Sequence, residues 1–392
     1  MIPFSYYAPV ALHVGRHIIE ESGELLCDYG SRAFVITSRF APGFRNLALE
    51  DMEAVLTEHE ISFVTYHDVE ENPSVESIVR VTDRIRDFHP DFLVAIGGGS
   101  ALDTAKAANV LIGYPKDSDP YQVFYGGEMA ETGSPSVGVL PLLGVPTTAG
   151  SGSEVAGYAV LTRRDIGTKL RMNQLSFFTD AFLDARYIEH SPQWLLDAGA
   201  LDAVAHGFES YFNVNSNPTN QMLVDAAFDL FRSYKNDLLN CTLQGEDFDQ
   251  MLLAATLQGM AVVQSSTTLP HALGYPLTHE KDVPHGLASC VTLAEYLRIF
   301  REEKHQRLVQ KLLKQTGFES IDELGDYLAQ IITRNTSFSC SEEKIEQWSQ
   351  QLFSNPQRIS RHPEPVSLED IRRMLRASLQ RLERVHADSR TA

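Results

Sequence analysis

Aspartate and histidine residues occur in two segments of the second half of the chain, at spacings that suit a shared metal ion. In "ALDAVAHGFESYF", Asp202 and His206 are four residues apart, so on a helix both side chains lie on one face. In "LPHALGYPLTHEKDVPHG", residues 269–286, His271 and His285 flank the turn-forming "GYPLTHEKDVP". This segment is too irregular for one helix or one strand, and we expect its turn to fold the two imidazoles toward one point.

Three imidazoles and one carboxylate form a ligand set that suits Zn(II) or Fe(II) and leaves room for a water or a substrate oxygen. Asp202 and His206 alone favour a plain polar helix face, and the histidines of the second segment shift the interpretation toward a metal site. His279, followed directly by three charged residues, is typical of a solvated loop.

A glycine-rich loop, "GGGS" at residues 97–100, follows the apolar segment "FLVAI" and precedes the helix-forming "ALDTAKAANVL". This order brings backbone N–H groups to the positive end of a helix dipole, where an anion such as a phosphate is stabilised. The loop departs from the dinucleotide fingerprint G-x-G-x-x-G, because Leu102 replaces the last glycine. A tight turn that needs only glycine flexibility is the alternative.

A second polar loop, "VPTTAGSGSEV" at residues 145–155, follows the apolar run "VGVLPLLGV". The hydroxyl groups of Thr147, Thr148, Ser151 and Ser153 can donate hydrogen bonds there. Two such loops at the carboxyl ends of neighbouring strands can hold the pyrophosphate and sugar of a dinucleotide. The pair of loops therefore favours a dinucleotide site over a simple turn.

The composition is that of a globular protein, with 43% hydrophobic and 22% charged residues. A length of 392 residues predicts two domains. The net charge of −19 repels phosphate backbones and anionic membranes, which argues against nucleic acid and membrane partners. The four cysteines form no C-x-x-C pair, and no apolar run is long enough to span a bilayer, so we expect a cytoplasmic protein with free thiols.

The pattern of elements changes near the middle of the chain. Up to about residue 185, β-branched runs such as "RAFVITS" and "ISFVTYHDV" alternate with amphipathic stretches such as "LALEDMEAVLTEH", which predicts a parallel sheet wound with helices. Beyond residue 190, long helical periodicity dominates, as in "MLVDAAFDLFRSYKNDLL". We expect an α/β domain over residues 1–185 and an all-α domain over residues 186–392.

Four segments resemble signature segments of the iron-containing (group III) alcohol dehydrogenases: "IGGGSALDTAK", "PTTAGSGSEV", "GALDAVAHGFESY" and "HALGYPLTHEKDVPHG". They occur in the family's order, and the resemblance covers roughly residues 5–385. It implies a dehydroquinate synthase-like fold, in which a dinucleotide-binding domain and a helical domain form a cleft for the metal and the nicotinamide. We therefore expect a metal-dependent oxidoreductase that interconverts a primary alcohol and its aldehyde with NAD(P)(H).

The resemblance assigns roles to individual residues. Asp202, His206, His271 and His285 fall on the family's ligands for Fe2+, which Zn2+ also accepts. Many members carry a further histidine near the nicotinamide, four residues after the third ligand, where this chain has Tyr275. Tyrosine can donate a hydrogen bond or relay a proton, so we count Tyr275 among both the catalytic and the cofactor-binding candidates. The other cofactor-contacting positions fall on Asn72, Gly98, Gly99, Ser100, Asp103, Thr147, Thr148 and Lys169.

The end of "RAFVITSRF" predicts which nicotinamide is used. Folds that prefer NAD place an acidic residue after a strand to bind the ribose hydroxyl, and the family's "VTD" aspartate corresponds to Ser38. Ser38 removes the repulsion against a 2′-phosphate, and Arg39 can donate a charge-assisted hydrogen bond to it. We expect a preference for NADP; if Arg39 points to solvent, NAD and NADP are used equally.

Other interpretations stay open from the sequence. One is a glycerol dehydrogenase-like or other polyol dehydrogenase of the same fold, and another is a metal-binding protein that has lost turnover. Dehydroquinate synthase itself would need a cluster of lysines and arginines, and the ligand segments are poor in cations. No motif marks the particular alcohol or aldehyde substrate or the choice between iron and zinc. We also expect a homodimer.

Overall fold

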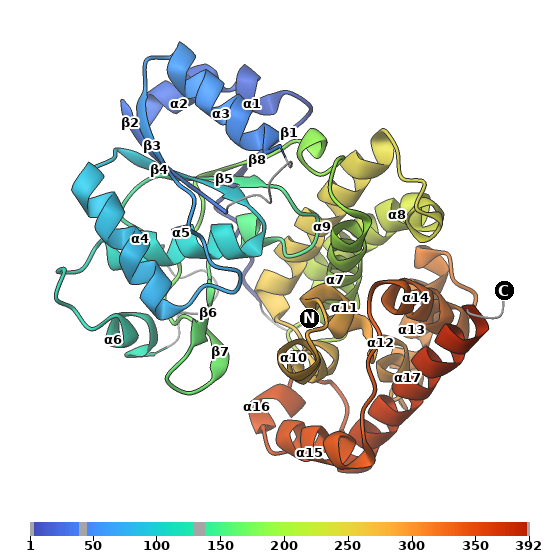
Figure 1. Cartoon of the computed structure of the whole chain (residues 1–392). Coiled ribbons are helices and arrows are strands. Elements are labelled where there is room, and N and C mark those ends of the chain that lie inside the picture. The colour runs from blue at the N-terminus through green and yellow to red at the C-terminus, as the bar shows by residue number, and fades with distance from the viewer. Residues whose placement is uncertain (1–3, 39–44, 129–137, 390–392) are drawn as a thin grey trace. The chain divides into compact units, whose positions relative to one another are not determined.

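The computed structural model describes residues 4–38, 45–128 and 138–389 (Figure 1). Contacts between Cα atoms divide the chain into two compact units, one comprising Ser5–His190 and the other beginning at Ser191. Among the described residues, all strands belong to the first unit, and the second is built from helices. This confirms the predicted fold class, an α/β unit with a parallel sheet followed by an all-α unit.

A six-stranded parallel sheet forms the centre of the first unit. Its order is β1-β8-β5-β4-β2-β3, and every pairing is parallel. Because the strands run in one direction, the loops that follow neighbouring β4 and β5 leave the same edge of the sheet. The strands are β1 (Ala11–Val14), β2 (Arg32–Thr37), β3 (Ser62–Tyr66), β4 (Phe92–Gly97), β5 (Leu142–Pro146) and β8 (Asp180–Leu183), beside an antiparallel pair of β6 (Val160–Arg163) and β7 (Thr168–Arg171).

Helices cover both faces of this sheet, which is why its strands are apolar on both sides. Phe34 and Ile36 of β2 belong to one buried core, and Ala33 and Val35 belong to the core on the opposite face. The first core is covered by α4 (Val75–Phe88), α5 (Gly99–Leu111) and α6 (Pro120–Tyr125), and the second by α1 (Ile18–Glu21), α2 (Gly23–Asp28) and α3 (Leu47–Glu58). Figure 1 shows the two groups on opposite sides of the strands. Two 3-10 turns, η1 (Ser153–Val155) and η2 (Ala185–Tyr187), complete the unit.

The second unit is organised around one buried helix. Helix α7 (Gln193–Tyr211) is buried on almost every side from residue 196 onward and packs against α8 (Pro218–Asn240) and α9 (Glu246–Ser265). None of the described helices is long and apolar enough to cross a membrane. The remaining helices are α10 (Leu269–Lys281), α11 (His285–Cys290), α12 (Leu293–Leu297), α13 (Glu303–Thr316), α14 (Ile321–Asn335), α15 (Glu342–Phe353), α16 (Pro356–Ile359) and α17 (Leu368–Ser389).

The segment at residues 269–286 corrects one sequence prediction. It was expected to be too irregular for a helix, yet residues 269–281 form α10 with Pro276 inside it. Proline removes one backbone donor from a helix and disfavours its interior. That cost is offset here because Leu269, Leu273 and Leu277, spaced one turn apart, are all buried.

The reversal of the chain in this segment is much shorter than the predicted turn. Helix α10 ends at Lys281, and Asp282 adopts the left-handed conformation with φ of 53°. Helix α11 begins at His285, directly after Pro284, whose fixed φ suits the residue before a helix. His271 and His285 are therefore positioned by two consecutive helices and not by a long loop.

Candidate metal and cofactor sites

Helix α7 presents three titratable side chains at the spacing of a helical turn. Asp202, His206 and Glu209 are four and three residues apart, so they lie along one face. All three are buried in a helix that is itself buried on almost every side. Burying such groups is costly unless they have partners, so their position points to a function beyond packing.

Helices α10 and α11 place His271 and His285 beside this face of α7. The backbones approach closely because glycines stand at the contacts: a Cβ on Gly286 would lie 1.9 Å from the carbonyl oxygen of Ala198 in α7. A Cβ on Gly274 in α10 would lie 3.0 Å from the backbone of α11 at Ala288. Gly286 follows His285 directly, so the close approach at Gly286 sets the position of His285 against Asp202.

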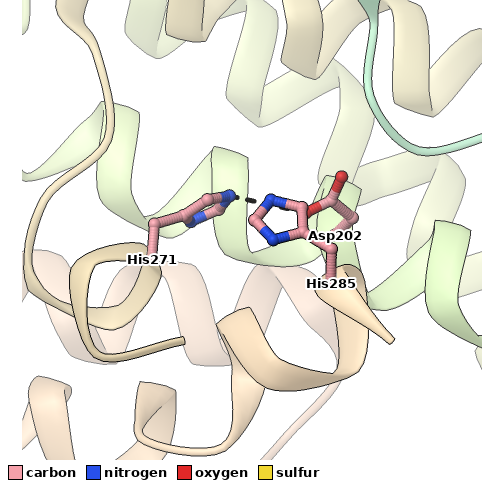
Figure 2. Close-up of side chains that lie close together, drawn as sticks. All are labelled: Asp202, His271 and His285. Atoms are coloured by element: carbon pink, nitrogen blue, oxygen red, sulfur yellow. Dashed lines mark ion pairs between the residues drawn. The ribbon is translucent and has the colours of Figure 1, made fainter. Parts of the chain in front are cut away.

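Three side chains converge on one point (Figure 2). Oδ1 of Asp202 lies 3.4 Å from Nε2 of His271 and 3.9 Å from Nε2 of His285. One ligand atom from each of the three residues lies within 4.8 Å of the others. His206 stands at the edge of this cluster: its Nε2 is 4.0 Å from Oδ1 of Asp202, and its ring stacks on His271 with centroids 4.7 Å apart.

The chemistry of these atoms fits a bound metal ion. Oδ1 of Asp202 and Nε2 of His271 are buried, and neither has a hydrogen-bond partner among the residues that the structure describes. A cation held by both atoms would satisfy them. Imidazole nitrogens combined with one carboxylate oxygen suit Fe2+ and Zn2+. The side chain of His285 is 39% exposed, so the cluster is open on that side.

The protonation of the cluster follows from its charges. Burial raises the pKa of Asp202, but the neighbouring His206, His271 and His285 outweigh it and hold that pKa below its ordinary value. Burial lowers the pKa of His271, but Glu209 and Asp202 outweigh it and raise that pKa to about 10. Asp202 is therefore a carboxylate, and a metal ion must displace a proton from His271 in order to bind.

Glu209 is a functional candidate that the sequence reasoning missed. It is fully buried, and its Oε2 accepts a hydrogen bond from Nδ1 of His271. Its Oε1 accepts from the backbone N–H groups of His271 and Thr268 and from the Thr268 hydroxyl. Because the donor at Nδ1 leaves Nε2 facing Asp202, Glu209 sets the orientation of His271 for metal binding. Glu209 follows His206 by three residues, and this helical spacing could have indicated that both lie on the same face of α7.

Tyr275 lies beside this cluster without belonging to it. Its ring stacks on His285 with centroids 5.8 Å apart and an interplanar angle of 16°. Four residues after His271 on α10, it occupies the next turn of the same helix face. The hydroxyl of Tyr275 is thus carried by a ring that contacts a candidate ligand.

We expect Gly286→Ala to damage the site through packing alone. The new methyl would overlap the carbonyl oxygen of Ala198, and the backbone would have to separate α11 from α7. Overpacking of this kind costs about 1–3 kcal/mol and displaces His285 from Asp202. Thermal unfolding and metal analysis of the variant measure both effects. Unchanged stability together with full metal content would contradict this account of helix packing.

In the first unit, the glycine-rich loop and the second polar loop are packed against each other. Helix α5 begins at Gly99 after the extended Gly98, and the N–H of Thr147 donates to the carbonyl of Gly97 at 3.0 Å. A Cβ on Gly98 would lie 3.1 Å from the side chain of Thr148. The structure therefore brings the two predicted loops together at the carboxyl edge of β4 and β5, where open α/β sheets bind ligands.

A hydrogen-bonded chain joins three further candidates to this loop pair. The N–H of Asn72 donates to Oγ of Ser100 at 3.1 Å, and Nζ of Lys169 donates to Oδ1 of Asn72 at 2.6 Å. Asn72 has a φ of 56°, a left-handed conformation that asparagine tolerates. Burial lowers the pKa of Lys169. Asn72, Ser100 and Lys169 are thus neighbours, although they come from distant parts of the sequence.

Asp103 is engaged by the protein itself. It accepts hydrogen bonds from the Ser153 hydroxyl at 2.7 Å and from the N–H of Val160 at 2.9 Å, and it pairs with Nζ of Lys106 at 2.9 Å. Lys106 is fully buried and also donates to the carbonyl oxygens of Ser153 and Tyr158. These bonds fasten α5 to the second polar loop, a role for Lys106 that the sequence reasoning missed.

Of the two residues proposed to select the nicotinamide, the structure describes only one. Ser38 follows β2 and forms an isolated antiparallel bridge with Asp68. Arg39 lies outside the described residues.

Known proteins resemble this chain over nearly its whole length. Residues 9–184 match the family described as iron-containing alcohol dehydrogenase, and residues 197–379 match the Fe-containing alcohol dehydrogenase family, C-terminal. The sulfoacetaldehyde reductase of Bilophila wadsworthia is 26% identical over 380 residues, covering 93% of this chain and 95% of that protein. The 4-hydroxybutyrate dehydrogenase of Clostridium kluyveri is 28% identical over 316 residues, covering 76% of this chain and 81% of that protein.

A solved structure gives the same result. The crystal structure of an iron-containing alcohol dehydrogenase from Thermotoga maritima has a TM-score of 0.83 and 31% sequence identity, covering 96% of this chain and 100% of that one. The matched architecture is a parallel-sheet unit followed by a helical unit, and it is shared with dehydrogenases. The chain belongs to the iron-containing alcohol dehydrogenase family. It is an NAD(P)-dependent oxidoreductase that interconverts a primary alcohol and its aldehyde by hydride transfer.

Proposed function

We propose that this chain performs its alcohol–aldehyde chemistry on one Fe2+ or Zn2+ ion held by Asp202, His206, His271 and His285. The observation that carries the proposal is the convergence of Asp202, His271 and His285, whose ligand atoms lie within 4.8 Å of one another. The buried atoms without hydrogen-bond partners, Oδ1 of Asp202 and Nε2 of His271, support it further. His206 completes the set because its ring stacks on His271 and its Nε2 faces the same carboxylate oxygen.

When bound, the ion supplies Lewis-acid stabilisation of charge on the substrate oxygen, and the nicotinamide gives or takes the hydride. The residues of the chain provide position and proton control. Glu209 keeps Nε2 of His271 directed at Asp202. Tyr275, stacked on His285, donates a hydrogen bond to the substrate or relays its proton.

The nicotinamide cofactor is bound, in this proposal, by the first unit. The N–H groups of the glycine-rich loop and the positive end of α5 stabilise the pyrophosphate. Lys106 and Asp103 hold the loops in place, so Asp103 acts mainly by positioning. The residues of the first unit that we propose to contact the cofactor are Ser38, Arg39, Asn72, Gly98, Gly99, Ser100, Thr147, Thr148 and Lys169. Tyr275 of the second unit is the remaining cofactor-binding candidate.

We expect the wild-type enzyme to prefer NADP to NAD, and Ser38→Asp to reverse that preference. A charge-assisted hydrogen bond from a cation next to Ser38 would favour the 2′-phosphate by about tenfold to a hundredfold. An aspartate at Ser38 would repel that phosphate and accept a hydrogen bond from the ribose hydroxyl of NAD. Measuring kcat/KM for both cofactors in both proteins decides this. A wild type that favours NAD tenfold would refute the prediction. Asp68, which forms a backbone bridge with Ser38, would then be the next carboxylate to substitute.

The experiment that tests the proposed function is an aldehyde panel. Protein loaded separately with Fe2+ and Zn2+ is mixed with short aldehydes, and consumption of NADPH or NADH is followed by absorbance. Turnover that depends on the added metal is expected. Bound metal without turnover of any aldehyde would instead favour a metal-binding protein that has lost catalysis.

We extend the proposal to assembly and location. The family resemblance favours a homodimer, which sedimentation analysis would test. All four cysteines are free, which supports a reducing, cytoplasmic location.

A further inference from the structure

A guanidinium group lies one aromatic ring away from the candidate metal ligands. The Cζ atom of Arg358, on the short helix α16, lies 5.4 Å from the centroid of the Tyr275 ring. The same ring stacks on His285 at 5.8 Å. These two contacts to one ring keep Arg358 close to the metal cluster, and all these residues belong to the second unit.

The positive charge of Arg358 has no carboxylate partner within the described part of the chain. Other arginines of the second unit are paired with carboxylates: Arg301 with Asp370 at 2.6 Å, and Arg372 with Glu346 at 2.6 Å. The protein has 52 acidic and 33 basic residues, so carboxylates are abundant. A half-buried guanidinium left with only an aromatic contact is available to an anion that the protein itself does not supply.

The negative charge of the protein gives a cation near the cluster a role in binding anionic substrates. A divalent ion would offset the two negative charges of Asp202 and Glu209, but the whole chain still carries −19. A substrate with its own negative charge is repelled by this field. A guanidinium nearby offsets the repulsion and can bind a carboxylate or sulfonate through two parallel hydrogen bonds.

We infer that Arg358 binds an anionic group on the substrate, so that the enzyme acts on short aldehydes or alcohols that carry a carboxylate or sulfonate. The inference rests on the proposed function at the metal site. In this arrangement the aldehyde oxygen lies at the metal ligands, and the oxyanion at the far end of the substrate pairs with Arg358. The ring of Tyr275 holds the guanidinium in place through the cation–π contact.

The test uses aldehydes of matched length: 4-oxobutanoate and 3-oxopropane-1-sulfonate as anions, and butanal as the neutral reference. We expect wild-type kcat/KM to favour at least one anion over butanal by about tenfold or more, the size of one charge-assisted hydrogen bond. Arg358→Gln should lower kcat/KM for that anion about tenfold to a hundredfold and leave butanal within about twofold. The two anions show whether carboxylate or sulfonate is preferred.

Control variants separate recognition from folding and from overall charge. Arg358→Lys keeps the charge and should restore part of the preference, because lysine lacks the planar fork. Arg307→Gln removes one positive charge from an exposed pair with Glu303 in the same unit and should leave the ratio of anion to butanal unchanged. Metal content should be equal in all four proteins.

A binding measurement makes the inference independent of turnover. Propane-1-sulfonate and butanoate should bind the metal-loaded wild type by calorimetry, and Arg358→Gln should weaken them about tenfold or more. If Arg358→Gln changes butanal and the anions equally, or if the anions bind both proteins alike, the inference is wrong while the dehydrogenase function stands. If no aldehyde is reduced, the proposed function fails, and the binding assay alone decides the role of Arg358.

Discussion

His271→Ala and His285→Ala are expected to abolish alcohol dehydrogenase activity and to lose the metal ion. Each change removes one of three ligand atoms that lie within 4.8 Å of one another. Loss of a residue that merely supports a ligand costs about tenfold to a hundredfold, so loss of a ligand itself should exceed that. Elemental analysis and kcat/KM, measured on the same samples, report the two losses together.

His279→Ala provides the matched control. His279 is an exposed imidazole on the same helix as His271 and lies outside the cluster. The control should keep both metal and activity. Variants of His271 or His285 that lose the metal yet keep the wild-type rate would disprove Lewis-acid catalysis at this site.

The second large effect is expected at Glu209, which would act on a bound metal through its hydrogen bond to His271. Glu209→Leu leaves Nδ1 of His271 and the N–H groups of Thr268 and His271 without their acceptor. The imidazole can then rotate or change tautomer, and we expect metal affinity to fall about tenfold to a hundredfold. Glu209→Gln keeps an acceptor oxygen, so its metal affinity should fall less.

Competition with a chelator measures that affinity, and circular dichroism of the metal-free proteins shows whether they are folded. A metal affinity that falls in the order wild type, Glu209→Gln, Glu209→Leu is expected for a residue that positions a ligand. If the folded leucine variant binds metal as tightly as the wild type, then Glu209 serves packing alone.

The strands and long helices were predictable because their signals are local. "RAFVITS" and "FLVAI" became β2 and β4, and "LALEDMEAVLTEH" became α3 with its capping Asn46. Helix α10 was not predicted, because Pro276 and Gly274 argue locally against a helix. What stabilises α10 is the burial of Leu269, Leu273 and Leu277, a tertiary effect that the chain shows only once folded.

The residues of the candidate site were also predictable only where they lie close together in the sequence. Asp202 and His206 share one helix and His271 and His285 share one motif, so their spacing made them visible. Glu209 gains its role only from contact with α10, although its interval from His206 gave a hint. Arg358 is 83 residues beyond Tyr275 in the sequence, and no motif joins them. Sequence patterns do not predict contacts between distant segments.

The most direct test of the account is a metal titration followed by turnover. Chelated, metal-free protein is titrated with Fe2+ without oxygen, and NAD(P)H oxidation by an aldehyde is measured at each step. We expect no turnover at the start, a linear rise in rate with added Fe2+, and a break at one ion per chain, with no rise in His271→Ala. Full turnover by the metal-free wild type would contradict it.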